Sequence, residues 1–303
     1  MRRSLRSYLA GWNRPERAAY LFIAPALAIL LLFTVVPLLA TLAISTMNMD
    51  VFLQVKGFIG LDHFERLLGD DRLIDAIKHT LYFAGVEVPL QIILALLTAV
   101  YLSRNTRWRK LLRSVYFVPS ICSFTAIGIV ASFLLDPQTG VYPAYLVNLG
   151  LPRLEFFRDP AWAMPSVIAL TVWRSFGYSM IILVAGIQSI PDSYYEAAQL
   201  DGAGKARQLF SITIPMLMPS LSFCVITTTI AAMQVFDQIF VTTQGGPLNK
   251  TETIVGYIYN TGFKMAPYDL GYASAISVML FVFIMAITLV MNRYFLRREA
   301  DMA

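Results

Sequence analysis

Long blocks without a charged residue are the feature that most constrains the fold of this chain. Residues 18–49, 114–135, 208–236 and 270–292 contain no Asp, Glu, Lys or Arg. Two more blocks hold a single charge each, Glu87 within 79–103 and Arg174 within 160–191. Each block exceeds the roughly 20 residues that a helix needs to cross the hydrocarbon core of a bilayer. Because backbone polar groups in lipid must be paired within the segment, the blocks predict six membrane-spanning helices.

The composition agrees with this class of protein. The chain is 57% hydrophobic and 14% charged, whereas a soluble globular domain has about 45–50% apolar and about 25% charged residues. The apolar blocks also lack the short alternating pattern that is typical of a transmembrane β-barrel. The sequence therefore predicts an all-α, polytopic membrane protein.

The basic residues are distributed unevenly about the predicted spans. They concentrate before the first span, between the second and third, in the loop at 190–215, and after the sixth span, with about half as many on the opposite side. Basic residues favour the cytoplasmic side, so we expect this loop and both termini, including Arg2 and Asp301, to be cytoplasmic. The net charge of +5 then reflects orientation in a membrane, and no nucleic-acid partner is expected.

These signals divide the chain into segments. We expect a cytoplasmic N-terminal segment at 1–19, a first transmembrane helix at 20–46 with an outer-side loop at 47–78, a five-helix core at 79–295 that contains the cytoplasmic loop 190–215, and a cytoplasmic tail at 296–303. The first apolar run is far longer than the roughly 7–15-residue core of a cleaved signal peptide, which favours an uncleaved span.

The residues that would support metal or covalent chemistry are scattered. Cys122 and Cys224 fall inside predicted spans, and His63 and His79 stand apart from other candidate ligands. A polytopic membrane enzyme would need a nucleophile or metal set that converges at membrane depth. We therefore expect a non-catalytic chain without a cofactor or metal of its own.

The loop IPDSYYEAAQLDGAGKARQLFSITIP at 190–215 interrupts the apolar blocks with a polar helical hairpin. Ser193 and Glu196 have the spacing of a capping box, which predicts a helix that starts near Tyr194. Gly202 and Gly204 tolerate positive φ and are expected to end that helix. The sequence GAGK is not a Walker loop, because it lacks the first glycine and the Ser or Thr that this phosphate-binding motif requires.

A second helix should follow the turn. Helical spacing predicts one face made of Ala203, Ala206, Phe210 and Thr213, with Lys205, Arg207 and Gln208 turned away, and a break at Pro215 that leads into the fifth span. The result is a short, rigid, two-helix projection that suits a cleft on a soluble partner. The alternative is a surface hairpin that only connects two spans.

The spacing of this loop resembles a known motif. Glu196-Ala197-Ala198, three residues, Gly202, nine residues, and then Ile212-x-Ile214-Pro215 is similar to the EAA loop of membrane subunits in binding-protein-dependent ABC importers, with Ile214 where Leu is usual. The stretches TVWRSFGYSMIILVAGIQSIPDSYYEAAQLDGA, TTQGGPLNKTETI and FKMAPYDLGYASAISV resemble the carbohydrate-uptake branch, with its maltose-type and glycerol-phosphate-type permeases.

The resemblance implies an ABC type I importer permease fold in a bacterial cytoplasmic (inner) membrane. The implied partners are a second homologous permease, two ATPase subunits (or an ATPase homodimer) that use ATP and Mg, an extracytoplasmic solute-binding protein and membrane lipid. The implied substrate is a sugar, expected to be a di- or oligosaccharide, with another solute such as glycerol 3-phosphate as the alternative. The residues expected to couple the chain to the ATPase are Glu196, Ala197, Ala198, Asp201, Gly202, Ile212 and Pro215.

Polar side chains at membrane depth are costly and indicate a substrate pathway. One stripe lies in the fourth span and another near the end of the fifth, and the expected pathway residues are Thr171, Arg174, Ser175, Tyr178, Thr228, Gln234, Phe236 and Asp237. In maltose-type permeases these two spans grip the sugar. The alternative is that the polar groups bond to one another, with an ion pair between Arg174 and Asp237. Glu87 could pair with Arg174, line the cavity or bond locally.

Overall fold

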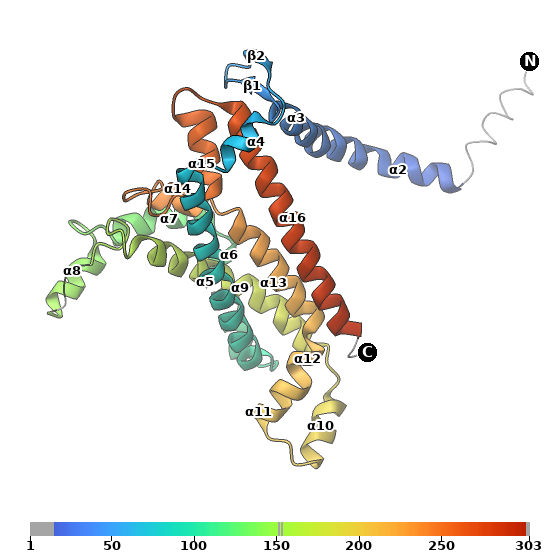
Figure 1. The fold of residues 1–303 in the computed structure, drawn as a ribbon. Coiled ribbons are helices and arrows are strands. Elements are labelled where there is room, and N and C mark those ends of the chain that lie inside the picture. Colours follow the sequence, from blue (N-terminus) through green and yellow to red (C-terminus); the bar gives the residue numbers. More distant parts are fainter. Residues whose placement is uncertain (1–14, 151, 153, 301–303) are drawn as a thin grey trace, which may run out of the picture. The chain divides into compact units, whose positions relative to one another are not determined.

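The computed structural model describes residues 15–150, 152 and 154–300 (Figure 1). The predicted cytoplasmic positions of Arg2 and Asp301 lie outside the described residues, as does most of the predicted segment 1–19. The chain forms two compact units, one of residues up to Leu68 together with 261–278, and one of residues 69–260 together with the end of the chain from Met279. Each unit is described by itself.

The smaller unit begins with a long apolar helix. It runs through α2 (Pro15–Leu30), a wide π-helical turn η1 (Leu31–Val35) and α3 (Val36–Ile44). Residues Phe22–Ile44 are long and apolar enough to cross a membrane. Pro37 is the second residue of α3, just after the wide turn. Proline has no backbone N–H, and its ring clashes with the preceding turn of a regular α-helix, so the wider turn before it accommodates this residue.

The rest of this unit consists of short elements and the start of the last helix. Strands β1 (Met47–Met49) and β2 (Val55–Phe58) pair antiparallel and are followed by α4 (Asp62–Leu67). Asp269, just before α16 (Leu270–Ala300), accepts a hydrogen bond from Arg66 at 2.9 Å. The predicted outer loop 47–78 is therefore partly structured. Helix α5 (Asp71–Leu102) already starts within 47–78. It is capped by Asp70, whose side chain accepts from the backbone N–H groups of Arg72 and Leu73.

The larger unit is built around two long helices, α5 and α9 (Ala163–Gln188), which pack closely together and against α13 (Met218–Met233). Their buried contact contains small side chains, Ala95 and Ala99, opposite Met180 and Leu183. Small residues let helix backbones approach closely where lipid supplies no hydrophobic driving force. Helix α9 also lies close to α6 (Arg107–Ile121), since a Cβ on Gly177 would overlap the carbonyl oxygen of Tyr116.

Two further spans are broken. Helix α6 continues after Cys122 and Ser123 as α7 (Phe124–Leu134) with a bend of 93°. The segment α11 (Lys205–Gln208), η2 (Leu209–Thr213) and α12 (Ile214–Met216) meets α13 with a bend of 70°. With these pairs counted as single spans, the described chain has up to six helical segments able to cross a membrane. The predicted all-α, six-span class is confirmed, with a small β-hairpin as the one described sheet.

The remaining helices are short and lie in the links between spans: α8 (Val141–Asn148), α10 (Asp192–Leu200), α14 (Asp237–Thr242), α15 (Ile254–Tyr259) and η3 (Asn260–Lys264). A buried ion pair fixes the link before α15. Arg72 at the start of α5 donates to both carboxylate oxygens of Glu252, at 2.7 and 2.8 Å, and Asn260 donates to one of them at 2.6 Å. Glu252 is 2% exposed, so these donors replace the water that it loses.

Candidate functional site

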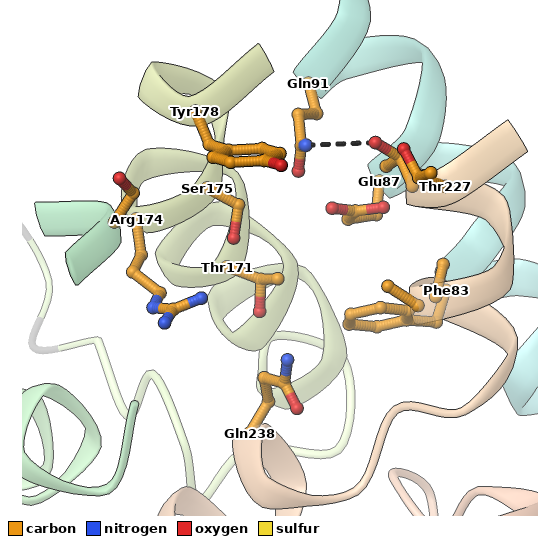
Figure 2. Close-up of a pocket in the computed structure, with 13 residues that line it drawn as sticks. Phe83, Glu87, Gln91, Thr171, Arg174, Ser175, Tyr178, Thr227 and Gln238 are labelled. Carbon is orange, nitrogen blue, oxygen red and sulfur yellow. Dashed lines mark hydrogen bonds between the residues drawn. The ribbon is translucent and has the colours of Figure 1, made fainter. Parts of the chain in front are cut away.

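A cavity of about 320 Å³ lies between α5, α9 and α13 in the larger unit. Figure 2 shows that polar side chains from these helices point into it. Its lining residues are Phe83, Glu87, Gln91, Ser120, Thr171, Arg174, Ser175, Tyr178, Thr227, Thr228, Ala231, Ala232 and Gln238. A cavity of this size is at the lower end of the roughly 300–1,000 Å³ that small-molecule sites occupy.

The α5 wall of this cavity is rich in hydrogen-bond acceptors. Gln91 donates from Nε2 to Ser179 Oγ at 3.1 Å and to Thr228 Oγ1 at 3.2 Å, which ties α5 to α9 and α13. Its Oε1 and the Oε2 atom of Glu87 are buried and have no hydrogen-bond partner among the described residues. Glu87 and Gln91 are four residues apart, so both acceptors lie on the same face of α5.

The opposite wall carries a cation. Arg174 of α9 donates from Nη2 and Nε to the carbonyl oxygen of Cys122, at 3.1 and 3.4 Å, and its guanidinium lies 6.0 Å from the centre of the Phe124 ring. That carbonyl is available because Cys122 ends α6 at the 93° bend. Among the described residues no carboxylate lies within ion-pair distance of Arg174. The considered pairs of Arg174 with Asp237 and with Glu87 are therefore absent.

The hairpin predicted at 190–215 is present as α10 followed by α11. Gly202 has a φ of +77°, and it donates to the carbonyl of Gln199 at 3.0 Å while Ala203 donates to that of Ala198 at 2.8 Å. These two bonds form a Schellman motif, which satisfies the last carbonyls of α10 and requires the left-handed conformation that glycine adopts without strain. The turn at Gly202 is therefore as predicted.

Three details of that prediction are wrong. The capping box is absent: α10 starts at Asp192 after the extended Pro191, so Ser193 already lies inside the first turn and makes no capping bond. Gly204 has a φ of −70° and starts α11. The break comes at Leu217 instead of Pro215, because the π-helical turn η2 takes up the proline that follows it.

The four residues predicted to share one face of the second helix are not buried as a unit. Phe210 is 68% exposed and Ala206 is exposed, whereas Gln208 turns inward and donates to the Ala203 carbonyl at 2.9 Å. The π-helical turn has more residues per turn than an α-helix, so it rotates the positions after Gln208 out of their expected phase. Thr213 is buried, and its Oγ1 lies 3.0 Å from the Tyr195 hydroxyl, which joins the two arms.

Comparison with known protein families assigns the chain to one of them. Residues 91–300 match the family described as binding-protein-dependent transport system inner membrane component. The chain belongs to this family. The matched region includes most of the cavity lining and the entire hairpin, and it implies a location in a cell membrane.

Individual relatives of this permease extend over nearly its whole length. It is 34% identical to the lactose transport system permease protein LacF of Rhizobium radiobacter, covering 98% of each chain. It is 32% identical to the sn-glycerol-3-phosphate transport system permease protein UgpA of Agrobacterium fabrum, covering 92% of this chain and 94% of the relative. Among solved structures, a bacterial ABC transporter involved in the import of the acidic polysaccharide alginate has a chain with a TM-score of 0.80 and 26% identity, covering 97% of this permease and 99% of that chain.

The permease brings together five of the eight predicted pathway residues: Thr171, Arg174, Ser175, Tyr178 and Thr228. The other three lie outside this cavity, because α13 ends at Met233 and the helical phase stops there. Gln234 caps α13, Phe236 stacks on Phe240 with ring centres 5.1 Å apart, and Asp237 starts α14. The sequence analysis did not predict that Glu87 and Gln91 together line the cavity, although they are polar residues four apart in an otherwise apolar block.

The predicted coupling residues of the permease are mostly accessible on the hairpin. Glu196, Ala197, Asp201 and Gly202 are exposed, and Ala198, Ile212 and Pro215 are half-buried. Large apolar side chains accompany them: Leu200 is 91% exposed and Phe210 68%. Exposed apolar side chains beside charges on a rigid turn are typical of a surface that another protein covers.

A second cavity of about 530 Å³ is lined by residues around the end of α7 and the end of α14. Its charges satisfy each other, since Arg158 donates to Asp136 at 2.6 Å. The backbone N–H groups of Thr139 and Gln138 also donate to Asp136 and hold the pKa of its carboxyl below the usual range. Because Arg158 and Asp136 are already paired with each other, this cavity is a weaker candidate for a ligand site than the first.

Proposed function

We propose that this permease is the membrane subunit of an ATP-driven importer for a sugar, in particular a di- or oligosaccharide. A second, homologous permease completes the membrane dimer, and an extracytoplasmic binding protein delivers the substrate. Two separate ATPase subunits use ATP and Mg²⁺, and this chain itself catalyses nothing. Both termini and the 190–215 hairpin face the cytoplasm, as the distribution of basic residues predicts.

The observation that carries this proposal is the polar cavity lined mainly by three spans. Polar groups at membrane depth are costly, so they indicate a pathway. Here acceptors from Glu87 and Gln91 face a donor, Arg174, across the cavity. A sugar hydroxyl both donates and accepts hydrogen bonds, so one sugar unit can satisfy both walls. The relatives named for lactose and alginate support a saccharide as the substrate.

The hairpin supplies the mechanical link. Its Schellman turn and the Tyr195–Thr213 contact hold its two arms together as a rigid body. A rigid element seated in a partner transmits that partner's movement to the helices that continue from it. Closure of the two ATPase subunits on ATP would in this way move the spans that line the cavity and change the side from which it is open.

Glycerol 3-phosphate is the second candidate substrate. Arg174 has no carboxylate partner among the described residues and could bind an anionic group. The relative UgpA is named for that solute. The α5 wall does not separate the two candidates, because the hydroxyl groups of glycerol 3-phosphate can also donate to the buried acceptors of Glu87 and Gln91.

The test is reconstitution of the complete importer in liposomes, with its partner permease, ATPase and binding protein. We expect lactose or maltose, loaded on the binding protein, to stimulate ATP hydrolysis and to be taken up, while an importer without this chain does neither. Stimulation by glycerol 3-phosphate alone would contradict the sugar assignment. ATP hydrolysis that ignores the binding protein would contradict the assignment to an importer.

A further inference from the structure

We infer that Glu87 and Gln91 of α5 accept hydrogen bonds from hydroxyl groups of the transported sugar, so that the second span selects which saccharides pass. This inference rests on the proposed function and deepens it. The predicted pathway lay in the fourth and fifth spans, and α5 contributes a third wall of different chemistry. Figure 2 shows both side chains directed into the cavity beside Thr227 and Phe83.

The two acceptor side chains of the α5 wall are buried. Glu87 is 3% exposed and Gln91 4% exposed, and one oxygen of each has no partner among the described residues. A buried polar atom without a hydrogen bond costs free energy, and a carboxylate costs more than an amide. Such atoms are rare in native proteins and call for a cause, and a ligand that donates to them is one.

Among the described residues no donor reaches Oε2 of Glu87. Among the described residues Glu87 takes part in no ion pair, and Arg174, the cation that also lines the cavity, is held on the opposite side by the carbonyl of Cys122. Gln91 uses its Nε2 group on Ser179 and Thr228, so its position is fixed while its oxygen stays open. The open oxygens of the α5 wall are therefore held in place to accept hydrogen bonds.

The chemistry of the wall defines the group that fits it. A hydroxyl donates to a carboxylate or an amide oxygen, whereas an ionised phosphate or carboxylate donates nothing and is repelled by Glu87. Side chains four apart on a helix have Cβ atoms about 5–6 Å apart, so the two acceptors can meet two hydroxyl groups of one sugar unit. Any anionic group of the substrate then faces Arg174 on the other side.

Variants separate this role from a structural one. Glu87→Leu and Gln91→Leu remove the acceptors, and Glu87→Gln keeps one acceptor oxygen of the same length. Replacing an unpaired buried carboxylate by an apolar side chain is neutral or stabilising for folding, so Glu87→Leu should assemble at the wild-type level. Thr98→Val on the same helix is the matched control, because among the described residues the Thr98 hydroxyl donates to the backbone carbonyls of Leu94 and Ala95 in its own helix.

The readout is the rate of uptake by the complete importer in liposomes at saturating sugar-loaded binding protein, which removes the binding protein's own affinity from the comparison. The probes are lactose, maltose and their monodeoxy derivatives. We expect the wild type to transport a parent sugar about 10- to 100-fold faster than the derivative that lacks a hydroxyl read by α5, the effect of one charge-assisted hydrogen bond. Glu87→Leu should transport both at the slower rate, and Glu87→Gln and Thr98→Val should keep most of the discrimination.

The two possible failures differ. If the wild type transports the sugars and Glu87→Leu and Gln91→Leu keep its rates and its discrimination among derivatives, this inference is wrong and the proposed function stands. If the wild type transports neither sugar, the proposed function fails and the inference fails with it. Assembly of each variant is checked by co-purification with the ATPase, so a loss of rate without a loss of assembly supports the inference.

Discussion

The contact between α9 and α6 allows one glycine substitution to be worked out from the structure. A Cβ on Gly177 would overlap the Tyr116 carbonyl oxygen and lie 2.8 Å from the carbonyl carbon, whereas carbon atoms in contact are about 3.5–4.0 Å apart. The obstacle is backbone, which no rotamer change can move. Gly177→Ala therefore requires the two helices to separate by about 1 Å.

The expected cost follows from two opposing terms. Alanine favours a helix over glycine by about 0.5–1 kcal/mol, while overpacking of a close contact costs about 1–3 kcal/mol. Gly85→Ala is the matched control, because a Cβ there meets nothing within 4 Å and Gly85 lies in the helix α5. We expect Gly177→Ala to destabilise the permease by about 1–2 kcal/mol and Gly85→Ala to stabilise it slightly.

Two assays check this prediction. Unfolding by SDS titration in mixed micelles gives the free energies of both variants relative to the wild type. The uptake rate of the reconstituted importer is sensitive to the geometry of the cavity, because the lining residues Arg174 and Tyr178 lie within one turn of Gly177. A displacement of about 1 Å can lower a rate by up to about 100-fold. If Gly177→Ala is as stable and as active as Gly85→Ala, the helices are not held in contact at this glycine and the reasoning is wrong.

Further substitutions test three other parts of the molecule. Gly202→Leu should strain the hairpin turn by about 1–2 kcal/mol and, like Glu196→Lys, abolish ATPase co-purification or transport while membrane insertion is retained. Gly204→Leu, at an ordinary φ with open space around it, should do neither, and equal behaviour of the two leucine variants in co-purification would contradict the role of the turn. Arg174→Ala should lower substrate-stimulated ATP hydrolysis with assembly intact, and unchanged stimulation by loaded binding protein would refute this. Glu252→Ala removes the carboxylate that accepts from Arg72 and Asn260 and should destabilise the larger unit by about 2 kcal/mol in SDS titration, whereas a shift below about 1 kcal/mol would show that the pair is not a structural anchor.

Much of the fold follows from one property of the sequence, the absence of charge over membrane-length blocks. That property cannot locate helix ends, because a helix may extend beyond the lipid. Asp70 starts α5 through its cap, well before the apolar block from residue 79. Proline was also an imperfect guide to helix breaks, since the wide turn η2 accommodates Pro215 and moves the bend to Leu217.

The candidate site was predictable in part for a related reason. Helical spacing correctly grouped Thr171, Arg174, Ser175 and Tyr178, because α9 is regular over this whole stretch. The same spacing failed beyond Met233, where α13 ends. Which helix faces the α9 stripe depends on packing between distant segments, and a pattern within one segment does not contain that information.

The break between α6 and α7 has a consequence for how this site can change during evolution. Arg174 is held by the main-chain oxygen of residue 122, while the Cys122 side chain is exposed. Selection acting on the orientation of the guanidinium would therefore preserve the bend and leave the residue type at position 122 free to drift. An engineer who wished to redirect the cation would gain little from substituting Cys122 and would have to straighten the helix.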